Sequence, residues 1–149
     1  MQARVISIAA ALALAFSTAA LAQSAERKEK KAEHDRIEAD YKAAKAKCSV
    51  MKGNEKDVCE ADAKGKENVA KAELENKYEP SQAHARKVDE AKAEHEYKVS
   101  KEKCDLNKGK QESACEKEAK ARYDHAKADI KAKYAAAERK SATGSTTTK

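Results

Sequence analysis

The chain has 149 residues, of which 39% are charged, and it carries a formal net charge of +6. Its apolar fraction of 40% is mostly alanine, with no tryptophan and one phenylalanine, so a thick hydrophobic core is excluded. Burying a large apolar side chain contributes about 1.5–3 kcal/mol, whereas ordering the backbone costs about 1–2 kcal/mol per residue. The fold therefore needs covalent cross-links or a partner. Lysines and acids are interleaved, which is typical of an exposed helical surface held by salt bridges.

Residues 1–22 have the pattern of a secretory signal peptide. Arg4 supplies the positive start, residues 5–16 form an apolar run, and residues 20–22 form an A-x-A cleavage motif. The mature chain is expected to begin at Gln23 in the periplasm, with no stable membrane span after cleavage. The apolar run is short for a membrane span, and an uncleaved anchor is the alternative interpretation.

Two helices are predicted in the first half of the mature chain. Residues 24 to about 51 are rich in strong helix formers, and apolar positions recur along them at heptad spacing, namely at Ile37, Tyr41, Ala44, Cys48 and Met51. Gly53 and Asn54 then interrupt the pattern and suit a left-handed cap at the end of this helix. A second helix is expected from about Glu55 to Tyr78, where Pro80 stops it.

Two further helices are predicted after Pro80. The third runs from residue 81 to about Leu106, and Gly109 marks the next break. The fourth runs to about Lys140 with one continuous apolar stripe, formed by Cys115, Ala119, Tyr123, Ala126, Ile130, Tyr134 and Ala137. Residues 141–149, rich in serine and threonine, are expected to be a disordered tail. No alternating β pattern is present, so the predicted fold is all-α.

The second half of the chain repeats the first. Sixteen of the 38 positions from Tyr41 to Tyr78 are identical in the stretch from Tyr97 to Tyr134, including both cysteines and the glycine of each break. A repeat of this kind fixes the architecture. We therefore expect two tandem helical hairpins, at residues 23–80 and 81–140, either docked as a thin four-helix bundle or elongated.

The four cysteines are expected to form two local disulfides, since paired cysteines in a short exported chain are typical of a disulfide framework. Two residues 11 apart in one helix lie about 16 Å from each other, but a disulfide needs Cα atoms about 4.4–6.8 Å apart. Residues equally distant from a turn face each other across a hairpin, and Gly53 and Gly109 lie midway within the two pairs. The expected bonds are Cys48–Cys59 and Cys104–Cys115, each contributing about 3 kcal/mol.

Metal binding and redox catalysis are the alternative roles for the cysteines. A metal site would add His34, His84, His95 or His125 as ligands, but C-x10-C lacks the close spacing of structural zinc sites, and the histidines do not recur in the repeat. A redox thiol would be expected to show C-x-x-C. No catalytic motif, phosphate loop or dinucleotide fingerprint is present. No catalytic residue, metal or cofactor is assigned, and the five tyrosines are expected to cover the thin core rather than stack on bases.

The repeated motif resembles a known group of proteins. Its elements are Tyr-Lys-x2-Lys-x-Lys-Cys, a glycine five residues on, Cys-Glu-x2-Ala-Lys, and a closing Lys-Tyr. This pattern is similar to that of small alanine- and lysine-rich exported proteins of proteobacteria, some of which are described as TolA-like cell-envelope proteins. The resemblance implies an exported, helical envelope protein and no particular chemistry.

The expected function is therefore that of a non-enzymatic structural or interaction protein of the periplasm and cell envelope, with a role in stress responses as one option. Its partners would be envelope proteins or anionic envelope polymers, and an oligomer is compatible with the sequence. One alternative is electrostatic binding of a polyanion, with lipopolysaccharide favoured over nucleic acid. Another is metal sequestration through cysteine and histidine.

Overall fold

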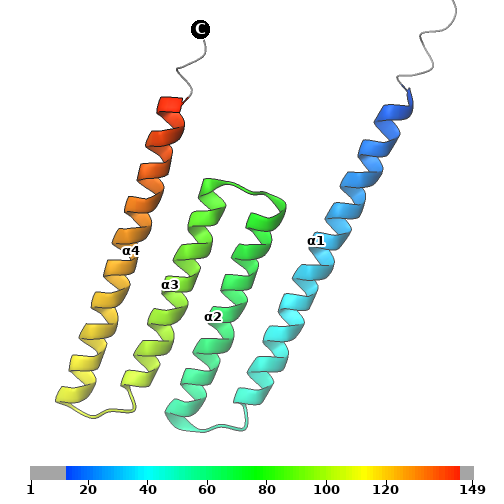
Figure 1. Cartoon of the computed structure of the whole chain (residues 1–149). Coiled ribbons are helices and arrows are strands. Elements are labelled where there is room, and N and C mark those ends of the chain that lie inside the picture. Colours follow the sequence, from blue (N-terminus) through cyan, green and yellow to red (C-terminus); the bar gives the residue numbers. More distant parts are fainter. Residues whose placement is uncertain (1–12, 145–149) are drawn as a thin grey trace, which may run out of the picture.

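A computed structural model describes the backbone of residues 13–144 and the side chains of residues 23–140. This part of the chain is all-helical, which confirms the predicted class. Its four helices are α1 (Ala13–Cys48), α2 (Gly53–Tyr78), α3 (Gln82–Cys104) and α4 (Lys110–Gly144). Helices α1 and α2 form the first hairpin, and α3 and α4 form the second (Figure 1).

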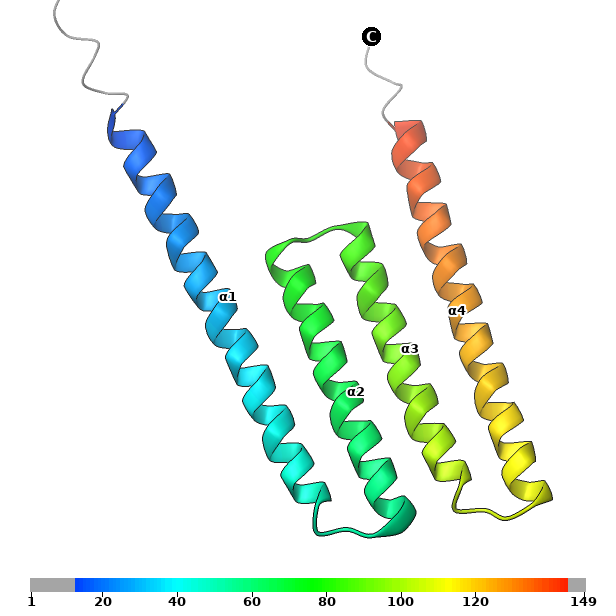
Figure 2. The same cartoon turned by 180° about the vertical axis from the view of Figure 1, so that it is seen from behind.

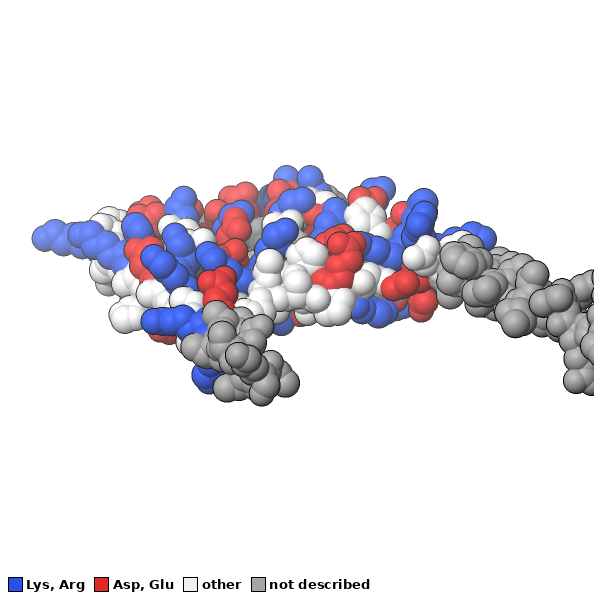
Figure 3. All heavy atoms as spheres, turned by 90° about the horizontal axis from the view of Figure 1, so that it is seen from above, with Lys and Arg blue, Asp and Glu red and all other residues white. Residues whose placement is uncertain are grey.

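The helices lie side by side in one row. Helix α1 packs on α2, α2 on α3 and α3 on α4, and among the described residues no other pair of helices is in contact. Views from opposite sides show this open order (Figures 1 and 2), and the view from above shows a molecule wider than it is thick (Figure 3). The two hairpins therefore do dock, through α2 and α3, but as a single layer instead of a closed four-helix bundle.

The single layer follows from the scarcity of large apolar side chains. The buried apolar residues are few and mostly small, namely Cys48, Ala63, Leu74, Val88, Ala93, Cys104, Ala119 and Tyr134. They are spread along three helix–helix contacts, and among the described residues the large apolar side chains that stay exposed lie in the turns, so no helix needs another layer to cover it. Alanine in place of larger residues lets neighbouring helices approach closely.

The helix ends differ from the predicted ones by a few residues. Helix α1 ends at Cys48, because Met51 belongs to the connecting turn and its side chain is exposed. Helix α3 ends at Cys104, and Leu106 is likewise exposed in its turn. Ser81 is the N-cap of α3, where its hydroxyl accepts a hydrogen bond from the His84 amide.

The far end of the fourth helix also differs from the prediction. Helix α4 continues to Gly144, beyond the predicted end near Lys140, because no residue before this glycine breaks a helix. The expected tail therefore begins later than residue 141, and residues 145–149 lie outside the described part.

Both predicted turn glycines have left-handed backbones. Gly53 has φ +55° and Gly109 has φ +63°. The sequence analysis predicted that Gly53 caps the end of the first helix. In the structure Gly53 is instead the first residue of α2. Only glycine adopts such angles without the steric penalty of a Cβ atom.

We expect Gly53→Ala and Gly109→Ala each to lower the free energy of unfolding by about 1 kcal/mol, through backbone strain alone. No atom lies within 4 Å of a Cβ built at either site, so no steric clash adds to this effect. Chemical denaturation followed by circular dichroism would measure both variants and the double variant, whose effects should add. Asparagine, which tolerates left-handed angles, should cost less at the same positions, and equal losses for alanine and asparagine would contradict this explanation.

The predicted signal peptide lies partly outside the described residues, since residues 1–12 are not described. The helix that begins at Ala13 continues through residues 20–22, and cleavage before Gln23 stays a prediction. Among the described helices, none combines the length and the apolar character needed to cross a membrane.

Candidate functional site

Each hairpin is closed at its turn by a disulfide bond. Cys48 is bonded to Cys59 with the Cα atoms 5.6 Å apart, and Cys104 to Cys115 with a separation of 5.5 Å. The pairing predicted from the sequence is confirmed. Cys48 and Cys104 are fully buried, and disulfides of this kind are typical of proteins in an oxidising compartment. With the sulfurs joined, none of the four is a thiolate nucleophile or metal ligand.

The opposite end of each hairpin is closed by a repeated polar cluster. In the first hairpin, the Tyr78 hydroxyl donates to the Glu33 carboxylate over 3.1 Å, and Lys77 forms an ion pair with the same carboxylate. In the second, Tyr134 donates to Asp89 over 2.8 Å and Lys133 pairs with Asp89 at 2.7 Å. Each of these residues is the repeat counterpart of one in the other cluster, so the repeat extends to contacts between helices.

These clusters shift the pKa values of their members. The hydrogen bond from Lys77 lowers the pKa of the Glu33 carboxyl, and that from Lys133 does the same for Asp89. Burial, followed by the hydrogen bond to the acid, raises the pKa of Tyr78 and of Tyr134. At neutral pH each cluster therefore holds an ionised acid between a protonated lysine and a neutral tyrosine.

We expect the protein to lose stability in acid. A carboxyl group with a lowered pKa in the folded state contributes fully above its unfolded pKa of about 4, and the contribution is lost as the pH falls through the folded pKa. The melting temperature should therefore fall between about pH 5 and pH 2. Thermal melts of the wild type and of Asp89→Asn check this, because the variant should depend less on pH. A melting temperature that stays constant down to about pH 2 would contradict the role of the acids.

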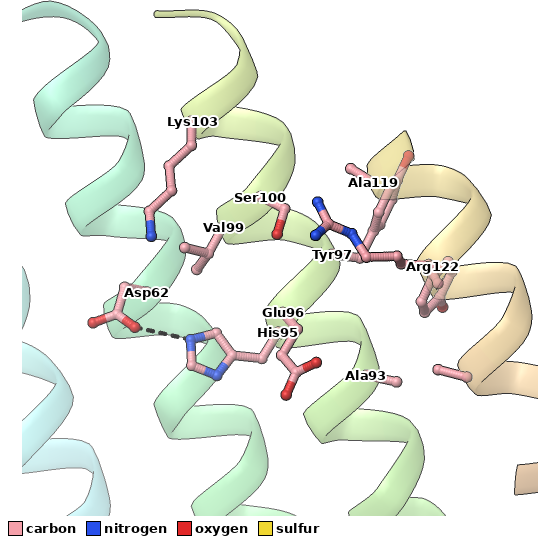
Figure 4. Close-up of a pocket in the computed structure, with 12 residues that line it drawn as sticks. Asp62, Ala93, His95, Glu96, Tyr97, Val99, Ser100, Lys103, Ala119 and Arg122 are labelled. Carbon is pink, nitrogen blue, oxygen red and sulfur yellow. Dashed lines mark hydrogen bonds and ion pairs between the residues drawn. The ribbon is translucent and has the colours of Figure 1, made fainter. Parts of the chain in front are cut away.

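A groove lies on the second hairpin and its junction with α2, with a volume of about 330 Å³ (Figure 4). The rings of Tyr97 and Tyr123 stack here, with centroids 4.7 Å apart and planes inclined by 11°. The groove also contains a carboxylate, Glu96, and a guanidinium, Arg122. These groups suit stacking, ion pairing and hydrogen bonding with a bound molecule.

The first hairpin carries an equivalent groove of about 280 Å³. Its lining residues are Ile37, Asp40, Tyr41, Ala44, Ala63, Lys66, Glu67 and Ala70. Each of them has its repeat counterpart in the lining of the other groove, which contains Ala93, Glu96, Tyr97, Ser100, Ala119, Arg122, Tyr123 and Ala126. A tyrosine, an acid and a base are kept in both. The candidate site is therefore a pair of repeated grooves.

The largest chemical difference between the two grooves is at one pair of equivalent positions, where the first groove has Glu67 and the second has Tyr123. The Glu67 side chain is only 5% exposed and accepts hydrogen bonds from Lys64 and Lys71, both at 2.8 Å. Burial raises its pKa, but the two lysines outweigh burial and the net shift is downward. Lys64 also lies over the Tyr41 ring, 5.1 Å from its centroid. One groove is thus lined by an ion network and the other by a stacked aromatic pair.

The junction between the hairpins is held by polar contacts of α2 with α3. The His95 ring nitrogen Nε2 lies 2.9 Å from an Asp62 carboxylate oxygen (Figure 4), and the pKa of Asp62 is lowered because hydrogen bonds from Lys66 and His95 outweigh the effect of burial. The ring lies against Gly65, where a Cβ atom would be 2.0 Å from His95 Cδ2.

Two more contacts cross the same junction. Lys92 pairs with Glu73 at 2.7 Å, and the Asn54 side-chain amide donates to the Glu102 carbonyl over 2.6 Å. The sequence had offered His95 only as a possible metal ligand. The signal that was missed is Gly65, a glycine inside a helix with no turn to explain it.

The surface charges are mixed. Blue basic and red acidic side chains alternate over the visible face (Figure 3), and many lysines are paired with acids, for example Lys66 with Asp62 at 2.6 Å. Among the described side chains, at residues 23–140, no three of His, Cys, Asp or Glu are placed to hold a metal ion. His34 instead lies 3.9 Å from Glu38, and His84 contacts the Glu79 carbonyl.

The five tyrosines lie where helices meet, with Tyr134 buried and Tyr41, Tyr78, Tyr97 and Tyr123 partly buried.

Comparison with known proteins gives no further assignment: no family model, no curated protein and no solved structure matches this chain.

Proposed function

We propose that this is a non-enzymatic interaction protein of the periplasm and cell envelope, which binds protein partners through its two repeated grooves. The observation that carries the proposal is the equivalence of every position of the smaller groove with a position of the larger one. Both grooves also keep a tyrosine, an acid and a base at equivalent positions, although the acid and the base differ in identity.

The nature of the grooves favours a protein partner over a small molecule. Small-molecule sites usually enclose most of their ligand in volumes of about 300–1,000 Å³, whereas a single layer of helices cannot surround a ligand. Tyrosine and arginine are enriched at protein interfaces, and the larger groove contains Tyr97, Tyr123 and Arg122. Helices α1 and α3 run in the same direction in the row (Figure 1), so we expect both grooves to open on one face, where a long helix or a repetitive partner can contact both.

Two features support the proposed envelope location. The two disulfides are typical of an oxidising compartment, and the start of the chain, at positions 1–22, matches the pattern of a signal peptide.

Polyanion binding has less support, because the lysines are interleaved with acids and no single-sign surface appears in the view of Figure 3. A polyanion complex would weaken steeply with added salt, which distinguishes it from a groove complex.

Site-specific cross-linking tests the proposal. A photoreactive amino acid would replace Ser100 in one groove or Ala44 at the equivalent position of the other, in the chain expressed and exported in the native envelope. Lys98, which is exposed on α3 and does not line either groove, is the control position. We expect the same protein adduct from both groove positions and none from Lys98. No adduct from either groove, or equal adducts from all three positions, would overturn the proposal.

A further inference from the structure

We infer that copies of this chain assemble head to tail, with α4 of one copy packed on α1 of the next as α3 packs on α2 within the chain. Helices α1 and α4 lie at the two edges of the row, and each has an outer face that points away from its single neighbour. The inferred occupant of these two outer faces is a second copy of the chain. This inference concerns the edges of the row and is independent of what the grooves bind.

The internal repeat supplies the template. Advancing by one repeat takes α1 onto α3 and α2 onto α4, so the α2–α3 contact joins the end of one repeat to the start of the next. Helix α4 is the end of the second repeat, and α1 is the start of the first. The contact that the repeat would make next is therefore α4 with the α1 of another copy. Stacked repeats bury a continuous surface in this way, and their terminal faces are left open.

The outer faces are exposed where their counterparts are covered. On α2, Gly65 is buried at the junction, and on the same helical stripe Val58, Val69 and Ala72 are partly buried. The corresponding residues of α4 are all exposed, namely Ala114, Ala121, His125 and Ala128.

The same difference holds between α3 and α1. On α3, Val88 is buried and Ala91, His95, Val99 and Glu102 are partly buried. The corresponding residues of α1 are Ala32, Asp35, Ala39, Ala43 and Ala46, and all of these are exposed.

One of the polar contacts across the α2–α3 junction has oppositely charged counterparts on the two outer faces. The ion pair between Glu73 and Lys92 spans α2 and α3. Its counterparts are Asp129 on α4 and Arg36 on α1, which keep the same signs. Both are exposed, and in the described part of the chain neither forms an ion pair. If α4 of one copy packs on α1 of the next as α2 packs on α3, Asp129 and Arg36 come together.

The steric requirement is also met. At the internal junction, the small Gly65 makes room for the large His95. The counterparts are Ala121 and Ala39, so both sides carry a small residue and the outer helices can approach closely. In addition, α1 and α4 both extend past the turn between α2 and α3, at the same end of the row (Figures 1 and 2). In the mature chain, which is expected to begin at Gln23, the part of the α1 extension from Gln23 onward would run beside the α4 extension of the neighbouring copy.

The expected assembly is heterologous, because one face of each copy meets the other face of its neighbour. Such contacts form rings if the rotation between copies closes, and open filaments if it does not. The test is made on the mature, oxidised chain by sedimentation velocity over a range of concentrations. We expect the mass to rise above that of one chain as concentration increases.

Charge reversal at the predicted pair gives the decisive variants. Arg36→Glu and Asp129→Lys should each weaken self-association about tenfold or more, because like charges would face each other. Mixing the two variant chains should restore assembly. When the two chains alternate, one contact joins the unchanged Asp129 and Arg36, and the next joins the two reversed charges, so every contact has an opposite pair. Lys45→Glu makes the same charge change at an exposed residue of α1 outside the outer face and should have no effect. Circular dichroism verifies that all variants keep their helices.

A single-chain mass at every concentration would overturn the inference. Oligomers that form equally well with both charge reversals would also overturn it, as would variant chains whose mixture does not assemble. Binding of a different protein to the outer faces, with no self-association, would equally contradict it. The groove cross-links would be unchanged by these outcomes, so failure of this inference and failure of the proposed function are distinguishable.

Discussion

Removing the Cys48–Cys59 bond, by replacing both residues with alanine, should lower the free energy of unfolding by about 3 kcal/mol. The bond closes a short loop between cysteines with a sequence separation of 11, and cross-linking restricts the unfolded chain more than the folded one. Cys48 is also fully buried, so its loss removes packing as well. In a protein with so few large buried side chains, this is a large share of a total stability that is about 5–15 kcal/mol for ordinary domains. Urea denaturation followed by circular dichroism measures the effect.

The second hairpin provides the matched comparison. Replacement of Cys104 and Cys115 should cost a similar amount, because the two loops have the same length. Adding a reductant should destabilise the wild type by the sum of the two effects and should leave a chain without cysteines unchanged. If the cysteine-free chain were as stable as the oxidised wild type, the disulfides would not be what holds these thin hairpins.

Gly65→Val should separate the hairpins. A Cβ at this position would lie 2.0 Å from His95 Cδ2 and 2.9 Å from His95 Cβ, so moving only the tip of the ring cannot relieve the clash. Either α2 and α3 move apart or His95 leaves Asp62. Overpacking of this kind typically lowers the free energy of unfolding by about 1–3 kcal/mol. We expect a loss near ~3 kcal/mol, because the branched valine side chain adds two methyl groups at the contact. We expect the cooperative unfolding transition to divide into two, one for each hairpin.

His95→Ala in the same chain is the control. It removes the ring that the new side chain would hit, so the double variant should recover most of the loss caused by Gly65→Val. The double-mutant cycle isolates this interaction, since the two residues are in direct contact. Equal stability of Gly65→Val with and without His95 would show that the clash is not between these residues.

The hairpins and their disulfides were predictable because the repeat and the central glycines fix them locally. Cys48 and Cys59 lie nearly equidistant from Gly53, and the same arrangement recurs around Gly109. An antiparallel hairpin leaves no other pairing of neighbours. The ends of the helices were less certain, since Met51 and Leu106 fit the apolar spacing but lie in turns, where their exposure is tolerated.

The single layer and the grooves were not predictable in the same way. A chain whose apolar positions are mostly alanine has weak preferences for how its hairpins dock, so a bundle and a row were equally compatible with the pattern. The choice depends on close contacts such as Gly65 with His95, which lie on different helices and far apart in the sequence. The grooves combine residues from neighbouring helices, and the repeat at Asp40 and Glu96 preserves only their charge, so identity alone did not reveal it.

The most direct test of the open row is zero-length carbodiimide cross-linking of the oxidised chain, followed by peptide mapping of the monomer. Links between helices are expected to join only adjacent ones, at the observed ion pairs Lys30–Glu75, Lys71–Glu38, Lys77–Glu33, Lys92–Glu73 and Lys133–Asp89. Links between α1 and α4 within a single chain would require a closed bundle, and finding them in the monomer would contradict the account.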